Sequence, residues 1–76
     1  MSPREIINVA VTVGTMCEID SWLDLKKVVL VSIPPEDRTQ FSTRDPKTKE
    51  QSLNKFERTI VENYEKMTGI SLKVPR

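Results

Sequence analysis

Residues 48–69, TKEQSLNKFERTIVENYEKMTG, are the stretch from which we predict the fold. Thr48 followed by Gln51 is a capping-box pattern, and Gly69 stands where a left-handed glycine ends many helices. Between them the apolar side chains recur at steps of three or four, which places them on one side of an α-helix. They are Leu53, Phe56, Ile60, Tyr64 and Met67. The stretch therefore predicts a long amphipathic helix whose apolar stripe is buried against the rest of the chain.

Composition bounds the size and class of the molecule. The chain has 76 residues, of which 37% are hydrophobic and 30% charged, as in a single small folded domain over residues 1–76. A domain of this size buries only about 60% of its unfolded surface, so a dimer or a partner would help to stabilise it. Twelve basic and eleven acidic residues give a net charge of +1. Any attraction to nucleic acid must therefore come from a local patch.

The residue types that are missing argue against an enzyme. The chain has no histidine and a single cysteine, Cys17, so it lacks a Cys–His nucleophile pair and a cluster that could hold zinc. Its two glycines cannot form a phosphate-binding loop. We therefore expect no catalytic residues, no metal and no cofactor. The chain has a lone cysteine, and we see no apolar run of membrane length and no leader. We therefore predict a cytoplasmic or nuclear protein without a membrane partner.

Residues 6–13 support two interpretations. Isoleucine and valine alternate there with Asn8, Ala10 and Thr12, and this period of two, rich in β-branched residues, favours a strand. Against it, Ser2 to Glu5 has the serine, proline and glutamate of a helix start. We predict a strand whose second face, carrying Asn8 and Thr12, either faces water or forms a flat contact surface.

Further elements complete the expected fold. A short helix is predicted from Trp22 to Leu25, capped by Asp20 or Ser21. Residues 28–33 are predicted to form a buried strand, although they could instead extend that helix, and prolines follow them. Residues 38–43 would form a polar edge strand and residues 70–74 a short final strand. The expected class is α+β: a three- or four-stranded, mostly antiparallel sheet covered on one face by the long helix from Thr48 to Gly69.

Candidate binding residues fall into two groups. The most basic local region contains Arg38, Arg44 and Lys47, and it is either a solvated loop or a loop that contacts phosphates, with Phe41 as an apolar tip. Trp22 is the only tryptophan. It is predicted either to pack in the core or to anchor a partner.

Several short segments resemble, in order, one repeat of the TATA-box-binding protein family. They are Ile7-Asn8, Thr12-Val13, Cys17-Glu18-Ile19-Asp20, Leu25-Lys26-Lys27-Val28 and Arg44-Asp45-Pro46-Lys47-Thr48, followed by the long helix. The resemblance implies a sheet that lies on the DNA minor groove, with Asn8 and Thr12 on its DNA-facing side. That family uses two repeats and this chain has room for one at most, and a homodimer could restore the two-fold arrangement.

Two functions of different class follow. The first is a binding module, similar to half of that fold, which contacts nucleic acid or the transcription machinery. The alternative is a small protein-interaction or inhibitor domain that docks on a larger protein through a sheet edge or Trp22.

Overall fold

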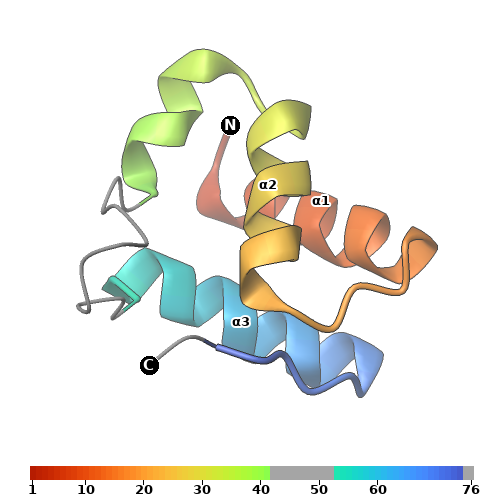
Figure 1. Cartoon of the computed structure of the whole chain (residues 1–76). Helices are drawn as coiled ribbons and strands as arrows, with labels where there is room; N and C mark the ends of the chain where they lie inside the picture. The colour runs from red at the N-terminus through yellow and green to blue at the C-terminus, as the bar shows by residue number, and fades with distance from the viewer. Residues whose placement is uncertain (42–52, 75–76) are drawn as a thin grey trace.

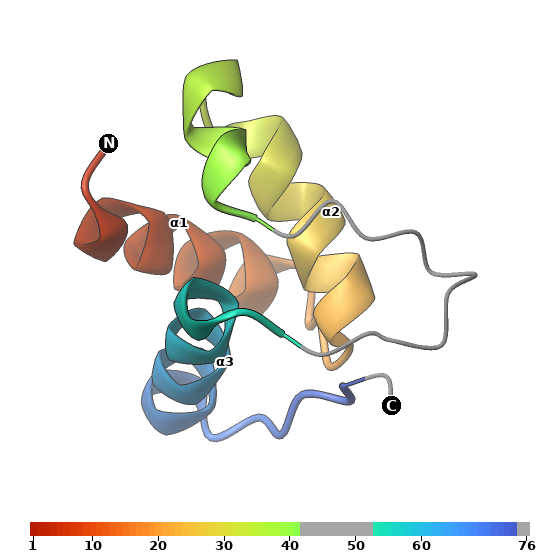
Figure 2. The ribbon, with the colours of Figure 1, turned by 90° about the vertical axis from the view of Figure 1, so that its left-hand side faces the viewer.

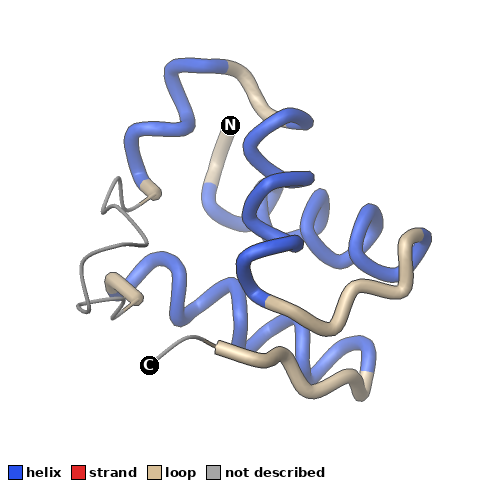
Figure 3. Tube along the Cα trace, viewed as in Figure 1, coloured by secondary structure: helices blue, strands red, loops and turns tan. Residues whose placement is uncertain are grey.

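The computed structural model describes residues 1–41 and 53–74 of the chain. Three α-helices make up most of this part: α1 (Pro3–Met16), α2 (Trp22–Ser32) and α3 (Lys55–Thr68), with a 3-10 helix, η1 (Pro35–Gln40), after α2. Figure 3 shows helices and loops throughout the described residues and no strand. The predicted α+β class, with a sheet covered by one helix, is therefore wrong.

The first segment is a helix, and the predicted strand over residues 6–13 is wrong. The helix begins with a complete capping box, in which the Glu5 amide donates to Oγ of Ser2 and Oε1 of Glu5 accepts from the Ser2 amide. The buried residues of α1 are Ile6, Ala10 and Gly14, spaced by one helical turn. Apolar valines also stand on both sides of this buried helical stripe. The sequence therefore fits the period of two of a strand as well as the period of a helix.

Residues 28–32 extend α2, so the predicted strand over residues 28–33 is wrong and the alternative of a longer helix is confirmed. The helix starts after Ser21, one of the two expected cap positions. It ends at Ile33, which is extended (φ −106°, ψ 159°), as the residue before a proline prefers. The edge strand expected over residues 38–43 is also wrong in its described part, because η1 runs through Gln40.

The predicted final strand over residues 70–74 reduces to one isolated parallel bridge between Ser21 and Lys73. The Trp22 amide donates to the Lys73 carbonyl over 2.9 Å, and the Lys73 amide donates to the Asp20 carbonyl over 2.8 Å. These two bonds attach the C-terminal segment to the start of α2, where Leu72 is buried.

The start of α3 differs from the prediction and its end does not. The helix is capped by Asn54, whose side chain accepts from the Glu57 amide, and the residues that suggested Thr48 as the cap lie outside the described part. Gly69 ends the helix in the left-handed conformation, with φ of 75°, as predicted.

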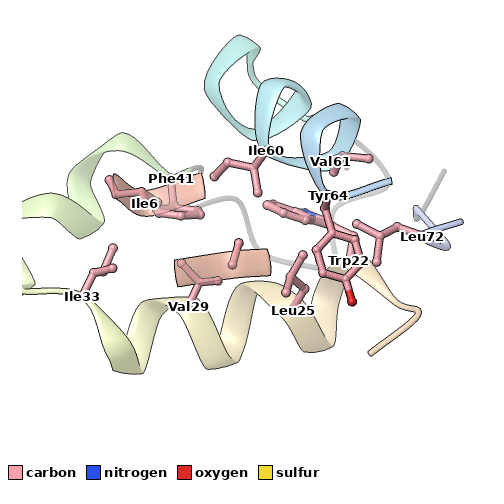
Figure 4. Close-up of a cluster of buried hydrophobic side chains, with 11 residues drawn as sticks. Ile6, Trp22, Leu25, Val29, Ile33, Phe41, Ile60, Val61, Tyr64 and Leu72 are labelled. Atoms are coloured by element: carbon pink, nitrogen blue, oxygen red, sulfur yellow. The ribbon is translucent and has the colours of Figure 1, made fainter. Parts of the chain in front are cut away.

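The helices enclose one apolar core. α1 packs against both α2 and α3. Figures 1 and 2 show that α2 lies on one side of α1, and the tail after α3 returns past the start of α2. Figure 4 shows core side chains from all three helices, together with Phe41 and Leu72, pointing into a common interior. Ile60 and Tyr64 of the predicted stripe are fully buried, whereas Met67 is 59% exposed.

Candidate functional site

The strongest candidate for a binding surface is the side of α2 that faces away from the core. Trp22, Leu25 and Val29 point inward at helical spacing and are buried. Of the remaining positions, some carry large apolar side chains and others are charged. We call the outer set the α2 outer face: Leu23, Asp24, Lys27, Val28 and Val31.

The apolar side chains of the α2 outer face are more exposed to solvent than apolar side chains usually are. Val31 is 76% exposed and Leu23 is 44% exposed, while Val28 is half-buried; Leu30 packs against the core. In Figure 1 the helices α1 and α3 lie behind α2. Within the described part of the chain, α2 is covered on the side of Trp22, Leu25 and Val29, and its outer face is not.

The charges on the α2 outer face balance. Asp24 and Lys27 are both exposed, carry opposite charges and lie one turn apart. Next to this face, Nε of Arg38 donates to the Leu30 carbonyl over 2.6 Å, which brings a cation to the C-terminal end of α2, where the helix dipole favours it. The face is thus neutral and apolar, and Arg38 stands at one end of it.

A buried ion pair fixes α2 against α3. Glu57 is 1% exposed, and its Oε2 lies 3.3 Å from Nζ of Lys26. Oε2 accepts no hydrogen bond of good geometry, so Lys26 compensates it mainly as a nearby charge. The other oxygen, Oε1, accepts from the Asn54 amide over 3.0 Å as part of the α3 capping box. The Glu57 carboxylate therefore caps the first turn of α3 and also pairs with Lys26 of α2.

Tyr64 positions the segment that leads into α2. Its hydroxyl donates to the Ile19 carbonyl over 2.7 Å. Burial, followed by the electrostatic effects of Asp20 and then of Cys17, raises the pKa of the Tyr64 phenol. At the far end of α1, hydrogen bonds from the backbone and then the side chain of Ser2 lower the pKa of the exposed Glu5.

The structure separates the residues that the sequence suggested for nucleic-acid binding. Asn8 and Thr12 are exposed on α1, on the side away from Ile6 and Ala10. Arg38 lies in η1 and contacts α2. Arg44 and Lys47 lie outside the described residues.

The two residues suggested for partner binding lie together inside the core. Trp22 and Phe41 stack with ring centroids 6.5 Å apart, and Phe41 meets Phe56 edge-on at 5.3 Å. Trp22 is 2% exposed and Phe41 is 4% exposed, so neither ring is on the surface. This aromatic group connects α2 and α3 through the residue after η1.

The α2 outer face was missed because residues 28–33 were interpreted as a strand. A single helix over residues 22–32 places Val31 on the side away from Val29, whereas Val28 lies one turn from Leu25.

Other kinds of site are not formed by the described residues. Residues 1–41 and 53–74 contain no group of three or more side chains suited to holding a metal ion. In the same part of the chain no helix is long and apolar enough to cross a membrane. Comparison with protein-family models, curated proteins and solved structures finds no match to this chain.

Proposed function

We propose that this chain is a non-catalytic protein-binding module that docks through the α2 outer face. The observation that carries the proposal is the exposure of Val31 and Leu23 on a helix whose other side is already buried. Single exposed apolar residues are common on protein surfaces, but a group of them on one helix face is typical of interaction sites. Amphipathic helices dock in this way, with apolar residues spaced by three and four positions.

A protein partner fits this face better than nucleic acid does. Phosphate binding requires an excess of basic residues, whereas Asp24 and Lys27 cancel each other on the face and the whole chain carries only +1. The DNA-binding saddle implied by the family resemblance is a sheet, and residues 6–13 form a helix instead. Phe41, the predicted apolar tip of a phosphate-contacting loop, is enclosed by Trp22 and Phe56. We therefore base the function on the apolar face.

The proposal is tested by comparing two substitutions that each place a carboxylate at an exposed apolar position. Val31→Asp changes the α2 outer face, and Met67→Asp changes α3 at a residue that is 59% exposed. The tagged chain and both variants are purified from the cells that naturally make it, after nuclease treatment, and the stoichiometry of co-purifying proteins, including untagged copies of the chain, is measured. Circular dichroism confirms that both variants keep their helices.

We expect a stoichiometric protein to accompany the unchanged chain and the Met67→Asp variant, and to be lost from Val31→Asp. A carboxylate in the centre of a buried apolar contact costs enough to lower affinity by about tenfold or more. Equal recovery from both variants, or no stoichiometric protein with the unchanged chain, would overturn the proposed docking face.

A further inference from the structure

Residues 70–74, which we call the strap, lie against the start of α2 in the way that an extended peptide lies against a receptor. Ser21 is extended, with φ of −124° and ψ of 134°, and forms a parallel bridge with Lys73. The Trp22 amide donates to the Lys73 carbonyl, and the Lys73 amide donates to the Asp20 carbonyl. These are the backbone hydrogen bonds by which an added strand binds to a free edge.

The strap is anchored by its side chains on one side only. Leu72 is its most deeply buried side chain, 7% exposed, whereas its neighbours Ser71 and Lys73 are exposed. Ile70 is half-buried and also packs against the core. Figure 4 shows Leu72 at the end of the core where Trp22 also lies. When a strand is added to an edge, backbone bonds supply affinity and side-chain pockets supply selectivity, so this place selects a large aliphatic side chain.

The last turn of α3 completes the contact. Oε2 of Glu65 accepts from the Leu72 amide over 2.8 Å, which fixes the backbone of the residue whose side chain is buried. The ion pair between Lys73 and Asp20 is long, at 3.9 Å, and both side chains are more than half exposed, so it contributes little. The strap is therefore held by backbone hydrogen bonds and aliphatic burial, and hardly by charge.

The strap can open without unfolding the helices. It leaves α3 after Gly69, whose left-handed conformation ends that helix. Its release exposes Leu72 and breaks the hydrogen bonds to α2 and to Glu65, while the packing of α1 against α2 and α3 remains. Local openings of this kind require less free energy than global unfolding.

We infer that the start of α2 and the last turn of α3 form a binding site for an extended peptide with a large aliphatic side chain, and that the strap occupies this site and blocks it. The site is separate from the α2 outer face and goes beyond the docking function proposed for that face. Because the strap belongs to the same chain, its effective concentration at the site is high. A peptide from another protein therefore binds in proportion to the fraction of chains whose strap is open.

The Trp22 amide reports on the strap directly. As the first residue of α2 it has no acceptor within its own helix, and its hydrogen bond goes to the Lys73 carbonyl. Hydrogen exchange measured by NMR compares it with the amide of Ile60, which lies inside α3 and reports on the fold. In the unchanged chain we expect the Trp22 amide to be less protected than the Ile60 amide, because the strap opens by itself.

Two variants release the strap by different means. Leu72→Asp removes the buried aliphatic side chain, and Lys73→Pro removes the amide that donates to Asp20 but keeps the leucine. In both we expect exchange at Trp22 to rise by about tenfold or more while the Ile60 amide stays protected. Glu62→Lys, at an exposed position of α3, is the control and should leave exchange at Trp22 unchanged.

A synthetic peptide with the sequence of residues 69–74, GISLKV, is the probe. It should slow exchange at Trp22 in both strap variants, and the same peptide with aspartate in place of leucine should not. The unchanged chain should bind GISLKV at least about tenfold more weakly than the variants do, because its own strap competes. Circular dichroism shows whether each variant keeps its helices.

Three results would overturn the inference. The first is equal protection of the Trp22 and Ile60 amides in the unchanged chain, which would mean that the strap opens only when the whole fold does. The second is loss of the helices in both Leu72→Asp and Lys73→Pro, which would make the strap part of the fold. The third is a GISLKV peptide that slows exchange at Trp22 no more than the aspartate peptide does. None of these results concerns the α2 outer face, which is tested separately with Val31→Asp.

Discussion

At the scale of single residues, the contact between Gly14 and Tyr64 sets how closely α1 and α3 approach. A Cβ atom added to Gly14 would lie 2.3 Å from Cε2 of Tyr64, far inside van der Waals contact. The ring cannot turn away freely, because its hydroxyl is bonded to the Ile19 carbonyl. Gly14 is helical, so it is needed here for its small size and not for its backbone freedom.

We therefore predict that Gly14→Ala destabilises the fold, by about 1–3 kcal/mol from overpacking, although alanine is the better helix former. Chemical denaturation followed by circular dichroism measures the change. Asn8→Ala and Thr12→Ala, on the exposed side of the same helix, are the controls and should change stability by less than about 0.5 kcal/mol. Equal stability of Gly14→Ala and the unchanged chain would mean that α1 and α3 lie farther apart.

Tyr64 gives a prediction for alkaline pH. Because burial raises the pKa of its phenol in the folded state, the neutral form is favoured there. The stability from this group is fully present below pH about 10, the ordinary tyrosine pKa, and is lost as the pH rises through the higher folded-state value. Tyr64 is the only tyrosine, so the near-ultraviolet absorbance of tyrosinate follows it alone.

In Tyr64→Phe we expect this component of the alkaline loss of stability to disappear, while stability at neutral pH falls by about 1 kcal/mol with the lost hydrogen bond. Urea titrations at neutral and alkaline pH compare the two proteins. A tyrosinate titration at the ordinary pKa in the folded chain would show that the phenol is not buried.

At the scale of elements, helix ends and one ion pair fix how α2 and α3 meet. Glu57 belongs to the capping box of α3 and lies 3.3 Å from Lys26 of α2, so its burial at the helix junction is compensated on both sides. Removing one partner of a buried pair leaves an uncompensated charge, which costs more than the pair itself contributes.

Lys26→Met should therefore lower stability by about 3 kcal/mol. Adding Glu57→Gln to it should recover most of that loss, because glutamine removes the buried charge and still accepts from the Asn54 amide in a capping box. A double-mutant cycle with the two single variants measures the coupling. A cost of less than about 0.5 kcal/mol for Lys26→Met would place this pair among ordinary surface ion pairs.

At the scale of the whole molecule, the three helices are stabilised by packing around one small apolar core. The buried residues come from every helix, so the loss of one side chain affects them all. Domains of this size have little stability to spare, since only about 60% of the surface exposed by the unfolded chain is buried.

Ile60→Ala, at the centre of α3, should cost about 2–5 kcal/mol and unfold much of the population at room temperature. Met67→Ala is the matched control on the same helix, because Met67 is mostly exposed, and should cost less than about 0.5 kcal/mol. Thermal melts followed at helical wavelengths compare the two. Similar melting temperatures would mean that the apolar stripe of α3 is not the buried one.

Local patterns in the sequence were sufficient where neighbouring residues complete the structure by themselves. The left-handed Gly69 and the end of α2 before Pro34 both depend on residues within a few positions of one another. The capping box at Ser2 and Glu5 is equally local, but the prediction of a strand over residues 6–13 went against it. The buried positions Ile60 and Tyr64 also followed, because their spacing fits one helical side.

Only the tertiary structure decided between helix and strand over residues 6–13 and 28–33. A run of isoleucine and valine presents apolar side chains at a period of two and at a helical period alike, so its conformation depends on what it packs against. Gly14 belongs to a helix here because the absence of a side chain lets Tyr64 of α3 approach, and Val29 because it joins Trp22 and Leu25 on one buried side. The same long-range packing buried the aromatic rings and left Val31 exposed.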